Sequence, residues 1–513
     1  MSKKKLLAVL TGMVMAFMGL AGVGAASAVD QQPEKASLTV HKYLGATTNL
    51  KHDGTAIEAG QLPKAPLAGV NFKLYKVEGV DVSTNDGLKL AQQIGAVPLT
   101  DDVVTNGIKV GETTYKLAAA PTTETTDTNG EAKFAGVERG LYVVVEDLEG
   151  STKIMNGQKE VVKEKITPIA PFAVTLPMTN PKGTAWNADV HVYPKNQENT
   201  LDKKVKDAGK HVGDDIVYTI STTSTGADLN GDGKMDRKDL GNVYEIVDTL
   251  DPNLAYQSVT VKVAGQDVTE GENGYQVTKE ATGDPAQDKV TVSFKGTTLD
   301  TIAAGAKVEL ELTANVKKDS AVGVIPNVAK LYPNDWAKKN DKPVVSPEVK
   351  TKFGDIVIKK VDGAGKVLAG AKFSVHLDTS DNKDCSTYGD AIKTSEATGD
   401  NGLVSIKGLH LTNFVDNEDV AEGDQHPYCL VEEQAPAGYQ LLPKAVKFSL
   451  TKEGSVTDLS AAAKAKAGNA LDITNHKNLG LPLTGAQGIL LVSVLGLILV
   501  SVGVVLTVKR RQD

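Results

Sequence analysis

The sequence contains few of the residues from which enzymes build reactive centres. Its 513 residues include two cysteines, two tryptophans and eight histidines, and aromatic residues make up only 5% of the chain. The histidines are scattered. We find no nucleophile elbow, no zinc-binding spacing and no pair of catalytic carboxylates. These absences argue against a hydrolase, and the sequence predicts a protein that is not an enzyme.

Positive charge is also scarce. The chain has 56 lysines and arginines against 64 aspartates and glutamates, so its formal net charge is −8. Without the charged residues at the two ends, which are six basic residues and Asp513, 50 basic and 63 acidic residues remain, a net charge of about −13. An acidic surface repels a phosphate backbone, which excludes nucleic acid as the expected partner.

The N-terminus has the pattern of a secretory signal peptide over residues 1–28. Lys3, Lys4 and Lys5 are followed by an apolar run from Leu6 to about Val23. The run ends in a small-residue cleavage site, Ala26-Ser27-Ala28. An N-terminal membrane anchor is the alternative, but the well-formed cleavage site disfavours it. We expect an exported protein.

The C-terminal segment, 479–513, carries three elements in a fixed order. A pentapeptide, an uncharged apolar stretch over 489–508 and a basic tail follow one another; the pentapeptide is Leu481-Pro482-Leu483-Thr484-Gly485. The apolar stretch is long enough to cross a bilayer as a helix, with the basic tail cytoplasmic. This order resembles the cell-wall sorting signal of sortase substrates. The resemblance implies that a membrane-bound cysteine transpeptidase cleaves between Thr484 and Gly485, so the membrane holds the chain only transiently.

Between its ends the chain is patterned for β-structure. Short alternating runs such as 37–42, 215–220 and 355–360 are separated by turn clusters, and no long amphipathic helix is apparent. This pattern is typical of β-sandwiches. We expect an all-β protein of tandem immunoglobulin-like sandwiches in an elongated rod.

The two cysteines, Cys385 and Cys429, both fall in the last third of the chain. In an exported protein two cysteines are expected to pair, and closing a loop of this length stabilises the fold by roughly 4 kcal/mol on the chain-entropy model. Two free buried thiols are the alternative.

Internal landmarks divide the mature chain. A Leu-Ala-Gly-x-x-Phe segment occurs at 67–72 and again at 368–373, each after a similar strand and before a similar Asn-Gly and Tyr-x-x-x-Glu segment. The repeated plan resembles the collagen-adhesin B-type module, and the different middle resembles the A-type module. We expect domains at 29–196, 197–350 and 351–478.

The segment Trp186–Asn196 contains Tyr-Pro-Lys-Asn, with Lys195 as its lysine. It resembles the pilin motif in shaft subunits of sortase-assembled Gram-positive pili, of the corynebacterial and actinomycete type. The resemblance implies that the amine of Lys195 attacks Thr484 of a neighbouring subunit and forms an intermolecular isopeptide bond. The reaction requires an accessible amine, and strand alternation places Lys195 at a domain edge. An ordinary solvated lysine is the alternative.

The segment 428–439 resembles the pilin E-box, with Glu433 in place of the usual threonine. Strand alternation places Glu432 on the same face as Tyr428 and Leu430. A glutamate on an apolar face needs an explanation, because burying it ionised is costly. The family supplies one: an intramolecular Lys–Asn isopeptide bond formed beside a buried acid.

Alternation then selects partners for such bonds. In the third domain we expect Lys360 bonded to Asn475, with Glu432 as the acid. In the middle domain we expect Lys203 bonded to Asn327, with Asp248 as the acid, and Lys204 as the rival lysine. In the first domain Lys42 and Glu146 occupy the positions that match the lysine and the acid of the third domain. Asn180 and Asn196 remain equal candidates for the asparagine. A buried salt bridge is the alternative for every set, and in the first domain it is as well supported as a bond.

The acidic segment 228–239 fits the spacing of a calcium loop. The expected ligands are Asp228, Asn230, Asp232, the carbonyl of Lys234, Asp236 and Asp239. Such a loop binds Ca²⁺ as a structural ion. A solvated acidic hairpin is the alternative.

Together these features predict a major pilin: a wall-anchored structural subunit that polymerises head to tail. The expected partners are further copies of the chain, a class C pilin sortase, a housekeeping sortase, minor tip and base pilins, and peptidoglycan. A wall-anchored adhesin that binds a host ligand without polymerising is the alternative function.

Overall fold

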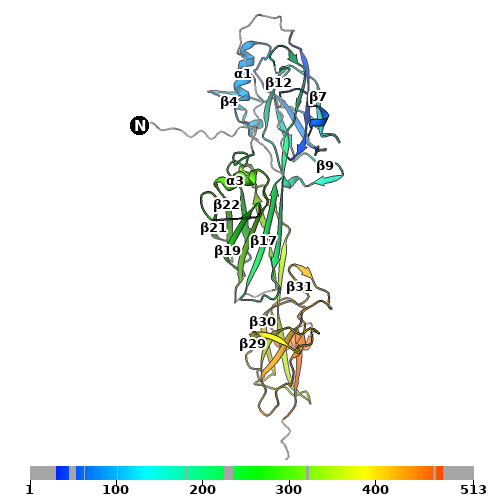
Figure 1. Ribbon diagram of the computed structural model, residues 1–513, viewed down its shortest axis with the longest axis vertical. Coiled ribbons are helices and arrows are strands. Elements are labelled where there is room, and N and C mark those ends of the chain that lie inside the picture. The colour runs from blue at the N-terminus through cyan, green and yellow to red at the C-terminus, as the bar shows by residue number, and fades with distance from the viewer. Residues whose placement is uncertain are drawn as a thin grey trace, which may run out of the picture. The chain divides into compact units, whose positions relative to one another are not determined.

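The computed structural model describes residues 31–45, 53–62, 64–100, 102–180, 182–224, 235–318, 323–465 and 469–477. The chain divides into two compact units (Figure 1). Unit 1 holds residues up to Asp207, then Gly213–Lys318 and Ile325–Thr351, and unit 2 holds Ala208–Val212, Asp319–Val324 and the remainder. The predicted signal peptide and sorting signal lie outside the described residues, so both stay predictions.

Unit 1 begins with two facing sheets. One has the order β12-β8-β3-β6, with β12 Phe172–Leu176, β8 Gly140–Asp147, β3 Asn71–Lys76 and β6 Thr122–Thr125. The other has the order β15-β1-β7, with β15 Asp189–Val192, β1 Lys35–His41 and β7 Glu131–Glu138. Leu38, Val40, Phe72 and Phe134 are among the buried residues that join the sheets. The pairing of β1 with β15 is parallel, from Ser37 opposite Asp189 to Val40 opposite Val192.

A helical insertion follows β3 and was not expected from the sequence. Helix α1 spans Asn85–Gly95, and the hydroxyl of Thr84 caps it by accepting a hydrogen bond from the Gly87 amide. Ala91 and Ile94 on its inner face join a separate small core with the hairpin β4 (Ile108–Val110) and β5 (Thr113–Tyr115). Three helical turns with a side-chain cap are stable here because tertiary packing covers one face.

The second part of unit 1 is another pair of sheets. One contains β16 (Lys195–Lys206), β17 (Asp215–Ser224), β23 (Val308–Val316), β19 (Leu254–Val263) and β20 (Gln266–Val268) in this order. The other has β21 (Tyr275–Thr282), β22 (Gln287–Phe294), β18 (Glu245–Thr249), β25 (Ala329–Tyr332) and β26 (Val344–Val345). Helix α3 (Gly296–Ala303) and strand β24 (Val324–Asn327) lie in connections between the two sheets, and helix α4 (Asp335–Lys339) links the neighbouring strands β25 and β26.

Strand β16 belongs to both parts of unit 1. Its first residues pair with β2 (Tyr43–Leu44) and β11 (Ile166–Thr167) of the first part, and its later residues pair with β17. One continuous strand therefore joins the two parts, which explains why they cluster as one compact unit.

Unit 2 repeats the sandwich plan. Strand β27 (Val349–Asp362) pairs antiparallel with β30 (Leu403–His410) and parallel with β35 (Ala470–Asn475). The facing sheet has β29 (Tyr388–Thr394), β28 (Lys372–Asp378), β33 (Tyr428–Gln434) and β34 (Val446–Phe448), and α5 (Leu459–Ala465) packs beside β30 and β35. Ile356, Ile358, Phe373 and Leu430 belong to the shared core.

Shorter elements complete the described chain: η1 Ala59–Gln61, α2 Val103–Asn106, β9 Ile154–Asn156, β10 Lys159–Val161, η2 Lys163–Lys165, β13 Met178–Thr179, β14 Trp186–Asn187, β31 Phe414–Val415 and β32 Glu418–Asp419.

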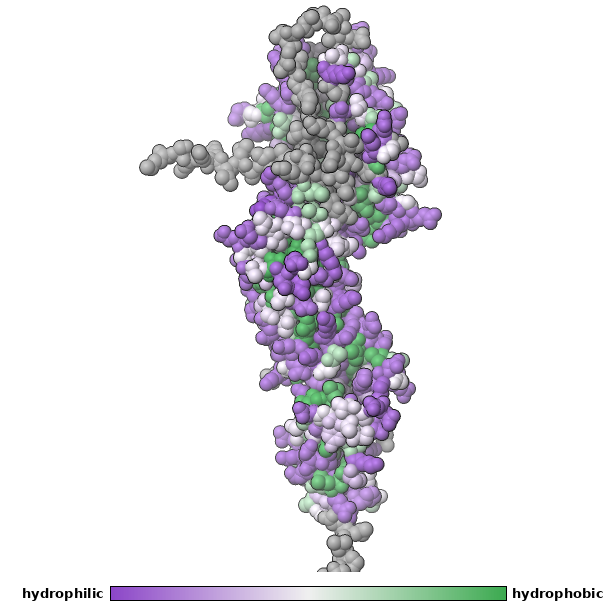
Figure 2. All heavy atoms as spheres, in the orientation of Figure 1, coloured by the Kyte–Doolittle hydropathy of each residue, from purple (hydrophilic) through white to green (hydrophobic). Residues whose placement is uncertain are grey.

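The expectation of tandem all-β, immunoglobulin-like sandwiches is confirmed. Hydrophilic residues predominate on the face shown in Figure 2. Within the described residues, no helix is long and apolar enough to cross a bilayer.

Candidate functional site

Three buried lysines, one in each of the three sandwiches, lie against an acidic side chain. In unit 2, the Nζ atom of Lys360 is 3.1 Å from Oε1 of Glu432, and both side chains are 0% exposed. The same amine donates a hydrogen bond to the carboxamide oxygen of Asn475. The Asn475 amide nitrogen donates to Oε1 and Oε2 of Glu432, at 3.0 and 2.9 Å. The structure thus brings the three predicted residues together.

The sheet register explains this convergence. Lys360 on β27 lies opposite Ile473 on the parallel strand β35, so Asn475 is two residues further along the same strand. Glu432 comes from β33 in the facing sheet and also accepts a hydrogen bond from the backbone of Leu442 at 2.9 Å. Burial lowers the pKa of Lys360, and Glu432 partly offsets this effect. The amine is therefore easier to deprotonate than a solvated lysine.

The second group lies between the sheets of the second sandwich. Lys203 on β16 makes an ion pair with Asp248 on β18, and their side chains are 0% and 2% exposed. Asn327 is buried next to Asp248. The rival, Lys204, is on the outer, exposed face of β16. Burial lowers the pKa of Lys203 and raises that of Asp248, while their mutual attraction opposes both shifts.

The first sandwich contains a third group. Nζ of Lys42 lies 3.1 Å from Oε1 of Glu146, with both side chains 0% exposed. The sequence left Asn180 and Asn196 as alternative partners of Lys42, and the structure places Asn196 beside this pair. Its amide donates to Oε2 of Glu146 at 3.1 Å and to the backbone carbonyl of Thr167 at 2.6 Å. Asn180 instead closes a turn, where its Oδ1 accepts a hydrogen bond from the backbone of Thr184.

The first and third groups share details that the sequence did not reveal. Oε2 of Glu146 accepts a hydrogen bond from the backbone of Ile169 at 2.8 Å, as Glu432 does from Leu442. Burial lowers the pKa of Lys42, Glu146 offsets part of this effect, and the positive charge of Lys195 adds to the lowering. An amine with a lowered pKa and a carboxamide are the two reactants of an amide exchange that releases ammonia, and a neighbouring acid can transfer the protons.

Lys195 differs from the expectation of an accessible amine. It is the first residue of β16, pairs with Tyr43 and is only 8% exposed. Strand β15 does end just before Pro194, as the alternation indicated. The prediction that Lys195 is accessible is therefore wrong for the isolated chain, because Lys195 is incorporated into a strand rather than left at an open edge.

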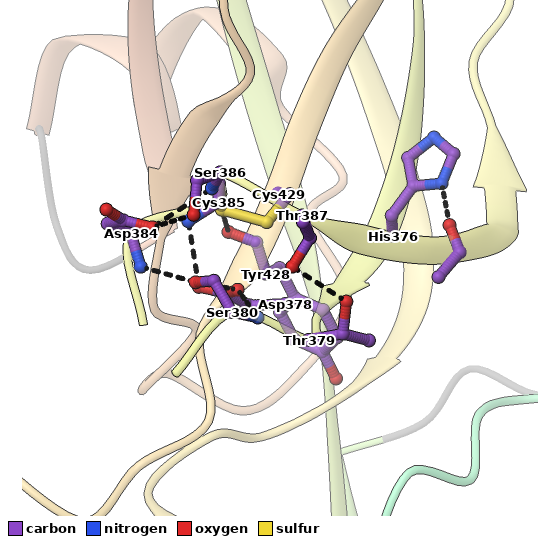
Figure 3. Close-up of a disulfide and its surroundings, with 11 residues drawn as sticks. His376, Asp378, Thr379, Ser380, Asp384, Cys385, Ser386, Thr387, Tyr428 and Cys429 are labelled. Carbon is purple, nitrogen blue, oxygen red and sulfur yellow. Dashed lines mark hydrogen bonds between the residues drawn. A yellow bond between two sulfur atoms is a disulfide. The ribbon is translucent and has the colours of Figure 1, made fainter. Parts of the chain in front are cut away.

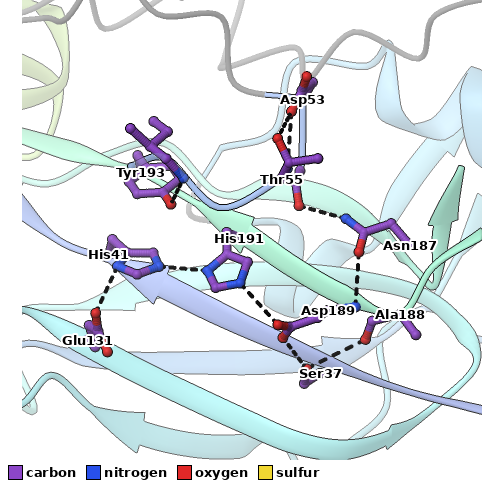
Figure 4. A network of polar contacts seen from close by, with 12 residues as sticks. Ser37, His41, Asp53, Thr55, Glu131, Asn187, Ala188, Asp189, His191 and Tyr193 are labelled. Atoms are coloured by element: carbon purple, nitrogen blue, oxygen red, sulfur yellow. Dashed lines mark hydrogen bonds and ion pairs between the residues drawn. The ribbon is translucent and has the colours of Figure 1, made fainter. Parts of the chain in front are cut away.

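A polar network lies along the paired strands β1 and β15 (Figure 4). Nε2 of His41 and Nδ1 of His191 are 2.8 Å apart, and the rings of His41 and Tyr193 stack with centroids 4.5 Å apart. Glu131 faces His41 at 3.3 Å, and Asp189 faces His191 at the same distance. From the strand pattern alone we expect His191 to be an exposed strand residue, and the structure contradicts this because His191 is half-buried in the network. Burial, then the neighbouring His191, lower the pKa of His41 to about 4.

The predicted disulfide is confirmed. Cys385 and Cys429 are bonded, with Cα atoms 5.6 Å apart (Figure 3). Cys429 lies in β33, three residues before Glu432. Cys385 lies in the loop after β28, where its backbone amide donates to Asp378 at 3.0 Å. The bond therefore ties this loop to the strand that presents the acid.

The predicted calcium loop lies mostly outside the described residues. Of its six ligands, Asp236 and Asp239 are described, and the Asp236 amide donates to the Asp239 carboxylate at 2.8 Å. Arg237 is bonded to Asp300 through its backbone amide, Nε and Nη2, at 3.0, 2.9 and 2.6 Å. These contacts fix the end of the loop, and calcium binding stays a prediction.

Two family models match the chain. The model of the N-terminal domain, D1, of Gram-positive pilin subunits matches residues 33–197, and a model of a prealbumin-like fold domain matches residues 354–464. The first match ends just after Lys195 and Asn196.

Whole-chain comparisons agree with these matches. The chain is 31% identical to fimbrial subunit type 1 of Actinomyces viscosus, over 96% of this chain and 95% of the relative. It is 29% identical to fimbrial subunit type 2 of Actinomyces naeslundii, over 93% and 90%. The structure of the full-length major pilin SpaD from Corynebacterium diphtheriae matches with a TM-score of 0.63 and 28% identity, over 86% of this chain and 97% of SpaD.

Proposed function

Because this chain belongs to the family of Gram-positive pilins, the fimbrial subunits, we propose that it is a major shaft subunit which a sortase polymerises through Lys195 and Thr484. The observation that carries the proposal is the arrangement at the start of β16. Lys195, the expected nucleophile, directly precedes Asn196, which is held against Glu146 beside Lys42. The residue that would be joined to the next subunit is thus adjacent in the chain to the buried group of the first sandwich.

In the polymerisation step, the sortase would hold the Thr484 carbonyl of one subunit as a thioester after releasing Gly485. The neutral amine of Lys195 in the next subunit would attack that carbonyl, forming an amide and returning the sortase thiol. Because Lys195 is buried in the isolated chain, docking of the sortase must expose it before the attack.

We propose that each buried group forms an intramolecular isopeptide bond. The lysine amine attacks the Asn carboxamide, the new C–N bond replaces the bond to the amide nitrogen, and ammonia leaves. The acid protonates the departing nitrogen and accepts the proton that the amine loses. The bonds are Lys42–Asn196, Lys203–Asn327 and Lys360–Asn475. The contact of Lys360 with Asn475 supplies the proximity that such a reaction needs.

The positions of these bonds suit a protein that bears tension. Force entering at Lys195 runs along β16 to Lys203, crosses to Asn327, follows the chain to Lys360 and crosses to Asn475. Thr484 follows nine residues later in the sequence. The covalent path therefore bypasses most of the second and third sandwiches, so those cores need not unfold when the shaft is stretched.

The proposed setting is the cell wall. A pilin sortase would join the subunits, a housekeeping sortase would attach the shaft to peptidoglycan, and minor pilins would occupy its tip and base. A structural Ca²⁺ in the 228–239 loop would stiffen the second sandwich.

A surface immunoblot of the producing bacterium tests polymerisation. Lys195→Arg should replace a boiling-resistant ladder by monomer, whereas Lys204→Arg, on the exposed face of the same strand, should leave the ladder intact. Wild-type cells that show only monomer would contradict the proposal and favour a non-polymerising adhesin.

A further inference from the structure

A tyrosine of the second sandwich lies within its lysine group. Tyr218 on β17 is 1% exposed and points to the same interior as Lys203. Nζ of Lys203 lies 4.6 Å from the centroid of the Tyr218 ring. The phenol hydroxyl lies against the Asn327 side chain. Tyr218 therefore contacts both residues that would become bonded.

The other two groups have a phenylalanine in this role. Lys42 lies 5.8 Å from the Phe72 ring centroid, and Lys360 lies 5.7 Å from that of Phe373. An aromatic ring thus accompanies the lysine of each of the three groups, and the ring of the second group alone carries a hydroxyl. A ring alone satisfies the packing requirement, so the hydroxyl of Tyr218 needs a separate explanation.

The asparagines also differ. A backbone carbonyl fixes the carboxamide in the first and third groups, where Asn196 donates to Thr167 at 2.6 Å and Asn475 donates to Gln440 at 2.8 Å. Asn327 has no such well-aligned bond from either side-chain atom to the described residues. Its carboxamide instead has Asp248 and the Tyr218 hydroxyl beside it.

Several polar atoms of the second group are poorly satisfied, as are Nζ of Lys42, Oε1 of Glu146 and Oδ1 of Asn196 in the first group. The Tyr218 hydroxyl, Oδ1 of Asp248 and both polar side-chain atoms of Asn327 are buried without a well-aligned hydrogen bond within the described part of the chain. Buried polar atoms without a hydrogen bond destabilise the folded chain. A cluster of them is expected where the geometry is optimised for a reacting state rather than for the resting side chains.

We propose that Tyr218 is a catalytic residue of the Lys203–Asn327 condensation, with its phenol donating a hydrogen bond to the Asn327 carboxamide oxygen as negative charge develops there. This inference rests on the isopeptide bond proposed above. The bond from Nζ to Cγ forms, the bond from Cγ to Nδ2 breaks, and ammonia leaves with the proton transferred through Asp248. Tyr218 keeps its proton throughout and stabilises the oxyanion.

The electrostatics of the site fit a donor rather than a base. Burial raises the pKa of the Tyr218 phenol, and the charge of Asp248 raises it further. A raised pKa favours the protonated hydroxyl, which is the form that donates a hydrogen bond.

The rate of bond formation tests this role. The full chain is synthesised in a cell-free system, and the Lys203–Asn327 cross-link is quantified over time by peptide mapping. Tyr218→Phe should slow this cross-link roughly 100-fold, the effect of removing one oxyanion donor. The Lys360–Asn475 cross-link in the same molecules should form at the wild-type rate. Tyr244→Phe is the matched control, because Tyr244 is also fully buried in this sandwich but is bonded to Thr222, at 3.0 Å.

A second variant separates catalysis from folding. Fluorotyrosine at position 218 keeps the shape of the side chain but makes the phenol a stronger donor, so the cross-link should form faster. A wild-type rate for Tyr218→Phe, or an unchanged rate with fluorotyrosine, would overturn the proposal while leaving the isopeptide bond itself in place. Absence of the Lys203–Asn327 cross-link from the wild-type chain would instead remove the bond on which the inference rests.

Discussion

The Asn475 amide nitrogen donates to both carboxylate oxygens of Glu432, at 3.0 and 2.9 Å, inside a core from which water is excluded. This places the acid at the atom that must leave as ammonia. The same acid–amide contact recurs between Glu146 and Asn196. Two independent cores therefore contain the same arrangement, and it gives direct predictions.

Glu432→Gln should prevent the third-sandwich bond, because an amide cannot transfer the proton that the departing nitrogen needs. The intact mass of the secreted protein should rise by the mass of one ammonia relative to the wild-type mass, beyond the small change of the substitution itself. Glu433→Gln, at the neighbouring exposed position, is the control and should retain the bond. A Glu432→Gln chain that has lost as many ammonia molecules as the wild type would show that the acid is dispensable.

In the first sandwich, Asn196→Ala should abolish a cross-link to Lys42, whereas Asn180→Ala should not affect it. The reason is that only Asn196 contacts Glu146, while Asn180 closes an outer turn. Peptide mapping of the two variants distinguishes these outcomes. A Lys42 cross-link that survives in Asn196→Ala would show that the contact with Glu146 does not identify the partner.

The histidine pair should make the first sandwich sensitive to acid. The pKa of His41 is lowered in the folded state from 6.5 to about 4, so the unfolded chain binds more protons between these values. The stabilisation is fully present above about pH 6.5 and is lost as the pH falls towards 4. Hydrogen-exchange protection of the β1 amides Leu38–Val40, corrected for intrinsic rates, should decrease over this window.

His41→Gln supplies the control for that experiment. It removes the titrating ring, so protection should vary less between pH 6.5 and 4 than in the wild type. Equal pH dependence in both proteins would assign the effect to other groups.

Removing the disulfide with Cys385→Ser and Cys429→Ser together should destabilise unit 2 by up to about 4 kcal/mol on the chain-entropy model. The cysteine substitutions should be made in the Glu432→Gln variant. In the wild type, a Lys360–Asn475 bond would itself constrain the unfolded chain around both cysteines. Denaturant unfolding with and without the bridge gives the difference. A difference near zero would mean that the loop after β28 contributes little to the chain entropy.

Strand alternation was a sufficient guide to the interiors of the sandwiches. It separated Lys203 from Lys204 and placed Glu432 on the core face, because successive side chains on a strand point to opposite sides. The all-β class followed from the same periodicity. The pairing of two cysteines in an exported chain was likewise predictable.

Long-range packing was not predictable in the same way. Helix α1 was missed because its apolar face is short and packs on a small core that the insertion shares with Leu141 and Val143 of the distant strand β8. Asn196 could not be chosen over Asn180 as the partner of Lys42 from the sequence. The choice depends on the pairing of β16 with β2, a contact between residues about 150 positions apart. The burial of Lys195 and the contact of His41 with His191 arise from the same return of the chain, which no local pattern reveals.

The most direct test of the account is peptide mapping of boiled, high-mass multimers from the bacterial surface. The account predicts a branched peptide in which the carbonyl of Thr484 is joined to Nζ of Lys195. A ladder whose cross-links involve another lysine, or a surface that carries this chain only as monomer, would contradict it.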